Sequence, residues 1–171
     1  MIATATVRGR VPRVVVSGGQ SGVDRAALDA ARALGIAIAG WCPRGRWAED
    51  GTISADYPLD ESESADPAER TRANVRDSDA TLVLISGDAD AGTELTVAVA
   101  GELGRPLLVH DLSRDDPGRL RAWLAQTRPV RLNVAGPRES NAPGIYARAY
   151  ALLRDGLNVA FDDGLDERAG G

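Results

Sequence analysis

The stretch Val14-Val-Val-Ser-Gly-Gly-Gln-Ser-Gly-Val-Asp-Arg-Ala-Ala-Leu28 joins a buried strand to a glycine turn and the start of a helix. Its three glycines, Gly18, Gly19 and Gly22, leave room for backbone N–H groups to approach a ligand closely. The helix that follows directs its unpaired N–H groups and the positive end of its dipole at the same point. The segment therefore predicts a cradle for a phosphate or a similar oxyanion, with the Ser21 hydroxyl as a further donor.

The glycine turn fits neither of the two best-known phosphate-binding patterns. It is not G-x-G-x-x-G, the dinucleotide fingerprint, and it lacks the lysine of G-x-x-x-x-G-K-[ST]. All 20 basic residues of the chain are arginine, which excludes a P-loop NTPase of the usual form. The alternative is a tight strand-to-helix turn in which the glycines serve only a steric purpose.

Short apolar runs alternate with longer amphipathic segments along the chain. The middle runs are almost continuously apolar, as is typical of parallel strands covered on both faces. Asp66 followed by Pro67 is a strong helix-start signal, and Gly35 ends the first helix. The pattern predicts an α/β, Rossmann-like, doubly wound, mainly parallel five-stranded sheet with helices on both faces. The expected strands are 13–17, 36–41, 80–86, 106–111 and 130–135, and the expected helices are 21–34, 67–78, 92–103, 117–126 and 143–154.

Length and composition favour a single domain over residues 1–171, with a core at about 12–155 and frayed ends at 1–10 and 162–171. The formal net charge of −5 argues against broad contact with nucleic-acid phosphates. The lone Cys42 cannot form an internal disulfide, and neither a signal peptide nor an apolar stretch of membrane-spanning length is found. We therefore expect a cytoplasmic protein without nucleic-acid or membrane partners.

Ligands of doubly wound sheets bind beyond the carboxyl ends of the strands, so four loops are candidates. They are the glycine turn and the segments 41–51, 86–96 and 133–141. In the third of them, Gly92 and Thr93 begin a helix and predict a second group of free amides.

Arginine side chains lie in or beside these loops, and their guanidinium groups suit phosphate or oxometalate oxygens. Each of them has an equally ordinary alternative, an ion pair with a surface carboxylate. We prefer Arg44 and Arg138 as ligand contacts. The full set is Arg25, Arg44, Arg46, Arg70 and Arg138.

Other side chains near the loops have both a functional and a structural interpretation. Arg70 and Asn74 share a polar helix face, which either lines the cleft or is solvated. The Cys42 thiolate would be able to reach a bound metal, but a lone cysteine is more often a small buried residue. Trp41 either stacks on a heterocycle or packs against the core. His110 is expected to be buried and hydrogen-bonded, and with a single histidine and a single cysteine we expect no protein metal site.

Several blocks in one order resemble the molybdenum carrier family, a circularly permuted branch of the Rossmann-like nucleotide-binding superfamily that also contains the Lonely-guy phosphoribohydrolases. The resemblance covers about residues 13–154. The matching blocks are 17–25 (SGGQSGVDR), 40–46 (GWCPRGR), 48–51 (AEDG), 70–71 with 74–79, 92–93 with 96, and 132–140 (LNVAGPRES).

This resemblance implies a ligand, molybdenum cofactor (molybdopterin) or a related phosphorylated pterin or nucleotide. The terminal phosphate of molybdopterin would lie on the amides of residues 19–22. Together with the loop analysis, the resemblance points to binding residues and to no catalytic residue. They are Gly18, Gly19, Gln20, Ser21, Gly22, Asp24, Arg25, Trp41, Cys42, Arg44, Arg46, Arg70, Asn74, Ser86, Gly87, Gly92, Thr93, Thr96, Gly136 and Arg138.

Two other functions remain open from the sequence. The first is hydrolysis of nucleoside 5′-monophosphates, as in the Lonely-guy enzymes, whose signature is P-G-G-x-G-T-x-x-E. Here Thr96 stands where that signature has glutamate, Glu94 directly follows Thr93, and Asp24 or Glu49 would have to substitute. The second is a non-catalytic nucleotide sensor, which needs the same kind of pocket as a carrier.

A carrier of this kind is also expected to be a homo-oligomer. Glutamate at Gly19 or Gly22 is expected to abolish ligand binding and to leave the protein folded, because it adds bulk and a like charge at the cradle.

Overall fold

The computed structural model describes residues 12–114 and 116–157. One five-stranded sheet has the order β2-β1-β9-β7-β8, and every neighbouring pair in it is parallel. The predicted doubly wound α/β sheet is therefore confirmed, whereas the expected frayed ends lie outside the described residues. The strands are β1 (Val14–Val16), β2 (Ala37–Ala39), β7 (Ala80–Ile85), β8 (Leu107–Asp111) and β9 (Arg131–Ala135).

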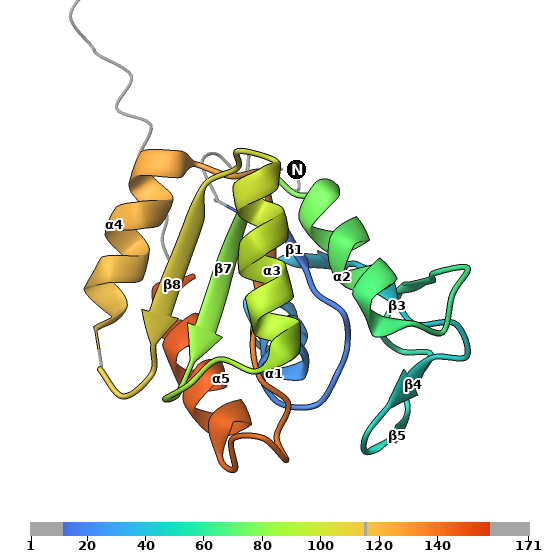
Figure 1. The fold of residues 1–171 in the computed structure, drawn as a ribbon. Helices are drawn as coiled ribbons and strands as arrows, with labels where there is room; N and C mark the ends of the chain where they lie inside the picture. The colour runs from blue at the N-terminus through green and yellow to red at the C-terminus, as the bar shows by residue number, and fades with distance from the viewer. Residues whose placement is uncertain (1–11, 115, 158–171) are drawn as a thin grey trace, which may run out of the picture.

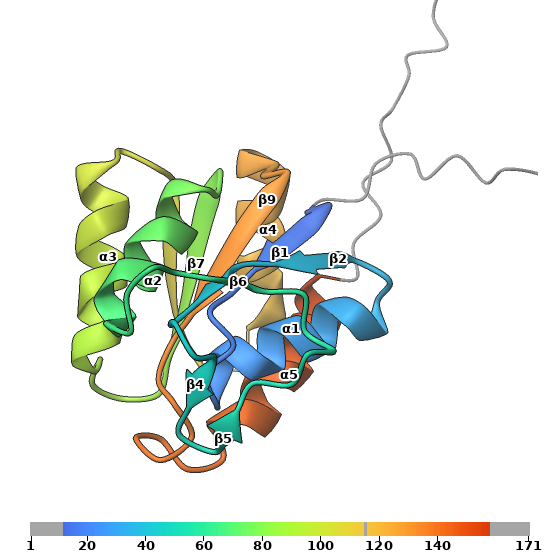
Figure 2. The same ribbon diagram turned by 90° about the vertical axis from the view of Figure 1, so that its right-hand side faces the viewer.

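Helices cover both faces of this sheet (Figures 1 and 2). The bounds of the helices lie within two residues of the predicted ones, because residues that cap or end a helix can be recognised in the sequence. Asp66 and Asp90, for example, accept N-capping hydrogen bonds from backbone amides. One face carries α1 (Val23–Ala33), α4 (Pro117–Thr127) and α5 (Ile145–Gly156), and the other carries α2 (Pro67–Arg76) and α3 (Ala91–Glu102).

The second predicted strand, 36–41, is shorter than expected because the chain leaves the sheet at Gly40. Gly40 has φ +147°, and a Cβ there would lie 2.0 Å from the Ser17 carbonyl oxygen. Beyond it, two small two-stranded sheets form that the sequence did not predict. They are β3 (Trp41–Cys42) with β6 (Asp60–Glu61), and β4 (Trp47–Ala48) with β5 (Gly51–Thr52).

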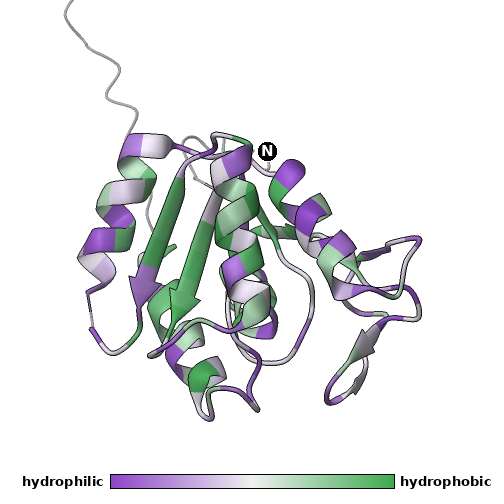
Figure 3. Ribbon diagram, viewed as in Figure 1, coloured by the Kyte–Doolittle hydropathy of each residue, from purple (hydrophilic) through white to green (hydrophobic). Residues whose placement is uncertain are grey.

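The two faces of the sheet are packed by different chemistry. The face under α1, α4 and α5 is apolar, and α1 approaches the sheet closely through buried alanines such as Ala27 and Ala30. On the other face α2 is largely hydrophilic, as Figure 3 shows. A layer of buried polar side chains lies between the sheet and α2 and α3; its members are Asn74, Thr81, Thr93, Thr96 and Asn133.

Among the described residues, no helix has both the length and the apolar character that crossing a membrane requires.

His110 is 1% exposed at the end of β8, and neither ring nitrogen has a hydrogen-bond partner among residues 12–114 and 116–157. The histidine is buried as expected, but none of these residues makes the expected hydrogen bond with it. Burial, reinforced by the positive charge of Arg119, lowers the pKa of His110 below its ordinary value.

Acidification from pH 7.5 to 5.5 should therefore lower the free energy of unfolding. The unfolded chain, in which the histidine pKa is about 6.5, binds the proton more readily, so stability present above that pH is lost as the pH falls below it. The His110 contribution is up to about 1.4 kcal/mol per pH unit. Urea unfolding at both pH values tests this. His110→Leu should reduce the difference, and an unchanged difference would contradict the assignment.

Candidate functional site

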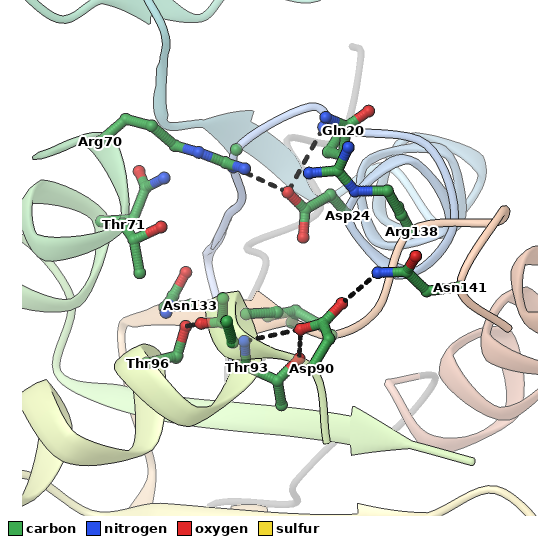
Figure 4. A pocket seen from close by; sticks show the side chains of 17 residues that line it. Gln20, Asp24, Arg70, Thr71, Asp90, Thr93, Thr96, Asn133, Arg138 and Asn141 are labelled. Atoms are coloured by element: carbon green, nitrogen blue, oxygen red, sulfur yellow. Dashed lines mark hydrogen bonds and ion pairs between the residues drawn. The ribbon is translucent and has the colours of Figure 1, made fainter. Parts of the chain in front are cut away.

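A polar cleft lies beyond the carboxyl ends of β1 and β9 (Figure 4). The helix after β1 and the helix after β7 leave toward opposite faces of the sheet, so a crevice opens above β9 between them. Its volume is about 180 Å³. Its walls come from the glycine turn and α1, from α2, from the start of α3 and from the β9–α5 loop.

A buried ion pair crosses one side of this cleft. Asp24 belongs to the first turn of α1 and is 5% exposed. Its Oδ2 atom accepts a hydrogen bond from Arg70 Nη1 of α2 at 2.9 Å and a longer one from the Gln20 amide at 3.4 Å. Burial raises the pKa of Asp24, against the opposing charge of Arg70. Glycine at position 18 leaves the space that this ion pair occupies, because a Cβ there would lie 1.5 Å from the Arg70 Nη1 atom.

The glycine turn does not offer all of its amides to a ligand. The Ser21 amide donates to the side-chain oxygen of Gln20 at 2.9 Å, and the Glu49 amide donates to the same oxygen. Gly19 has φ +76° and faces the apolar side chains of Ile53 and Leu59. The expectation of a fully free cradle over residues 19–22 is therefore corrected at Gln20 and Ser21, because an oxyanion would have to displace the side-chain oxygens that already hold their amides.

Glutamate at Gly19 or Gly22 would not leave the fold intact, contrary to the sequence-based expectation. Gly22 has φ +78°, and a Cβ there would lie 2.5 Å from the Pro137 carbonyl oxygen. A Cβ at Gly19 would lie 2.7 Å from the Leu59 Cδ1 atom. Both glycines are favoured by their positive φ, and Gly22 is also required by its close approach to the backbone of residues 137–139.

The amino-terminal end of α3 forms the opposite wall, and a carboxylate of the chain caps it. Asp90 Oδ1 accepts hydrogen bonds from the Thr93 amide at 2.9 Å and the Thr93 hydroxyl at 2.7 Å. Its other oxygen accepts from Asn141 Nδ2 at 3.0 Å. Burial alone would raise the pKa of Asp90, but these hydrogen bonds hold it below its ordinary value. Of the backbone amides predicted to be free at Gly92 and Thr93, that of Thr93 is therefore already hydrogen-bonded to Asp90.

Arg138 reaches the cleft from the β9–α5 loop. Its guanidinium lies 5.8 Å from the ring centre of Trp47 in β4, and its Nη1 atom is 3.9 Å from a Glu49 oxygen. The side chain is 34% exposed. Such a long ion pair leaves most of the guanidinium donors available to a ligand.

The structure brings half of the predicted binding residues together and disperses the others. Those that line the cleft are Gly18, Gln20, Asp24, Arg70, Asn74, Gly92, Thr93, Thr96, Gly136 and Arg138. Ser21, Gly22 and Arg25 line a separate groove on the other side of the glycine turn. There Arg25 pairs with Asp50 at 3.1 Å.

Several residues that were predicted to contact the ligand have a structural role instead. Arg46 donates to the carbonyl oxygens of residues 53, 54, 57 and 59. The Asn74 amide group, although at the edge of the cleft, is bonded to both the backbone N–H and the carbonyl of Trp41. Burial raises the pKa of the Cys42 thiol, which disfavours the thiolate.

The remaining predicted residues lie away from the cleft lining. Arg44 and Gly87 are exposed, and Ser86 is half-buried. The Trp41 indole donates to Asp77 at 2.8 Å and borders a third groove between α2 and α3.

Sequence reasoning left seven lining residues out of the predicted site. Four of them are polar, Thr71, Asp90, Asn133 and Asn141, and three are apolar, Ala91, Val134 and Ala135. Asp90 carried an available signal, because it precedes a helix and is a favoured N-cap residue. Asn133 was also detectable as a polar residue within an apolar strand.

Residues 15–157 match the sequence profile of the Circularly permutated YpsA SLOG family. This chain belongs to that family. The match covers all five helices and the whole sheet except Val14, the first residue of β1, so the cleft lies within it.

One solved structure similar to this SLOG-family chain is the crystal structure named "Putative molybdenum carrier protein", from Syntrophus aciditrophicus SB. The two chains are 38% identical, with a TM-score of 0.83, over 86% of this chain and 96% of that one. No protein with a curated description matches this SLOG-family chain. The predicted membership and fold are thereby confirmed.

The carboxylate of Glu49 holds the β4–β5 hairpin beside the cleft through hydrogen bonds. Glu49 accepts hydrogen bonds from the hydroxyls of Ser21 and Ser140 and from the Ser140 amide, which lowers its pKa. Three segments distant in sequence therefore meet at Glu49.

Replacing this carboxylate should loosen the hairpin. In Glu49→Ala, hydrogen exchange of the amides in residues 47–52 should become about tenfold faster, because opening no longer breaks charge-assisted hydrogen bonds. Exchange followed by mass spectrometry measures the effect, with Glu63→Ala at an exposed site as control. Equal exchange in the two variants would show that Glu49 does not hold the hairpin.

Proposed function

We propose that this protein binds a phosphorylated heterocycle in the polar cleft and acts as a carrier of molybdenum cofactor. The relative named as a molybdenum carrier, and the shared family, support the choice of cargo. The observation that carries the proposal is the cleft itself, at the switch point of the sheet, with Arg70 and Arg138 entering it from two different segments.

The two arginines supply complementary means of holding an anion. Arg138 has donors available and is partly exposed, so it is suited to meet the phosphate first. Arg70 is engaged with Asp24, and its Nε atom is buried and finds no hydrogen-bond partner among the residues that the structure describes. A phosphate oxygen that replaced the Asp24 carboxylate would take over the Arg70 fork and the Gln20 amide together.

Binding of a whole heterocycle requires the cleft to widen. Pockets for small molecules usually measure about 300–1,000 Å³, whereas this cleft measures about 180 Å³. Arginine side chains are the parts that adapt most readily, and the Arg138 guanidinium has only a cation–π contact with Trp47 and a long ion pair with Glu49 among the described residues. We infer that Arg138 moves first when a ligand enters and then contacts its phosphate. The molybdenum would arrive as part of the cargo.

One observation favours a second candidate function, the hydrolysis of nucleoside monophosphates. Asp24 is a carboxyl group in the cleft whose pKa burial raises, as a general acid requires. Glu94, the acidic residue nearest to the Lonely-guy signature, is exposed and is not among the lining residues of the cleft. Chromatography of a nucleotide panel incubated with the protein distinguishes the functions, since only a hydrolase releases free base.

Mass spectrometry of the gently purified protein tests the cargo directly. A carrier should retain a pterin with molybdenum, whereas a sensor should retain a nucleotide.

Arg138→Gln should weaken binding of a pterin phosphate about tenfold or more, because it removes a charge-assisted contact with the phosphate. Arg44→Gln is the matched control, since Arg44 is exposed and outside the cleft lining; its affinity should stay within about twofold of wild type. Calorimetric titration measures both. Equal losses in the two variants would place the ligand elsewhere.

Asp24 should compete with a bound anion, so sulfate should bind more tightly as the pH falls below 8. Because burial raises the pKa of Asp24, its carboxylate is neutralised at a higher pH than that of an ordinary aspartate, which frees Arg70 and the Gln20 amide. NMR titration of the amide resonance of Gln20 follows this with sulfate, which keeps its double charge. Asp24→Asn should bind more tightly at pH 8 and lose the pH dependence; a wild-type profile in this variant would contradict the competition.

A further inference from the structure

Two threonine hydroxyl groups at the floor of the cleft already donate their hydrogens to backbone carbonyl oxygens. Thr71 Oγ1 donates to the Pro67 carbonyl at 2.9 Å, and Thr96 Oγ1 donates to the Gly92 carbonyl at 3.0 Å. A hydroxyl group has only one hydrogen to donate, so these two oxygens are able only to accept hydrogen bonds from a ligand. Figure 4 shows Thr71 and Thr96 near Asn133 on the same side of the cleft.

Asn133 adds a third acceptor at this floor. It lies on β9, the central strand, and is 2% exposed. Its amide nitrogen makes one long hydrogen bond, to Thr81 Oγ1 at 3.4 Å, and no described residue donates to its amide oxygen. Buried amide groups in proteins are normally satisfied. An unpaired amide oxygen among the lining residues therefore points to a ligand that donates hydrogen to it.

One donor on the same side is also unpaired. Arg70 Nε is buried and has no hydrogen-bond partner in the described part of the chain, although the Nη1 atom of the same side chain is bonded to Asp24. The floor thus combines the Arg70 Nε donor and the second N–H of the Asn133 amide with three acceptor oxygens, those of Asn133, Thr71 and Thr96. Its complement is a ligand edge with one acceptor and at least two neighbouring donors.

We propose that the unpaired Asn133 amide oxygen and the acceptor hydroxyls of Thr71 and Thr96 select a heterocycle carrying an amino group beside a ring N–H and a carbonyl. Guanine and pterins present this edge. Hypoxanthine lacks the amino group, and adenine presents an acceptor where the edge needs a ring donor. This inference rests on the proposed function, because it concerns the heterocycle that the same cleft holds. It assigns Asn133 and Thr96 as specificity-determining residues.

The experiment compares dissociation constants for 6-hydroxymethylpterin phosphate, GMP, IMP and AMP by calorimetry. GMP and the pterin should bind at least about tenfold more tightly than IMP and AMP, because a ligand without the edge leaves buried acceptors unpaired. IMP within twofold of GMP, AMP tighter than GMP, or binding of the pterin without GMP would overturn the inference. Absence of binding by all four ligands would instead overturn the proposed function.

Variants test the residues themselves. Asn133→Leu should lower GMP affinity about tenfold, with folding checked by circular dichroism. Because Asn133 lies inside the sheet, Thr96→Val provides a second test that keeps the side-chain shape and removes the acceptor. Its matched control is Thr127→Val, since Thr127 makes the same type of hydrogen bond, to Trp123, on α4. Thr96→Val should lower GMP affinity severalfold and Thr127→Val should not; equal affinities would remove Thr96 from the proposal.

Discussion

The buried pair of Asp24 and Arg70 is the constraint on which the cleft depends. It links α1 and α2, two helices on opposite faces of the sheet, across the end of β1. The link passes over position 18, where only glycine leaves space for the guanidinium. Removing one partner of such a pair typically costs about 3–5 kcal/mol, because the other charge is left buried and unpaired.

The Asp24–Arg70 pair also shows that the anion site predicted from the glycine motif is already occupied by a carboxylate of the chain. A strand, a glycine turn and a helix start describe an anion site in general terms, and here the first anion in the site is the chain's own carboxylate. A ligand must therefore offer more than charge. It has to replace the contacts of Asp24 and also satisfy the polar floor, which is the physical basis for selectivity in an otherwise generic cradle.

The strands and helices of the sheet were predictable because apolar runs, caps and stop residues act over a few neighbouring residues. The candidate site was predictable only in part. Arg46 and Asn74 look like ligand contacts in the sequence, but their partners are backbone groups of residues 53–59 and of Trp41, which no spacing rule identifies. Conversely, Asn133 belongs to the site because β9 lies between β1 and β7, and strand order is a property of the whole fold. The two-residue strands of residues 41–61 are too short for any periodicity to reveal.

The contrast between the two faces of the sheet has a consequence for how the molecule opens. The side with α1, α4 and α5 is held by a large cluster of leucines, isoleucines, valines and alanines. The side with α2 and α3 combines a small apolar cluster around Val75, Val99 and Ala100 with a layer of asparagine and threonine. Partial unfolding of that second side would therefore uncover less hydrocarbon than unfolding of the first, and its opening would depend less steeply on denaturant concentration. The cleft is thus built against the side of the sheet with the smaller share of apolar packing.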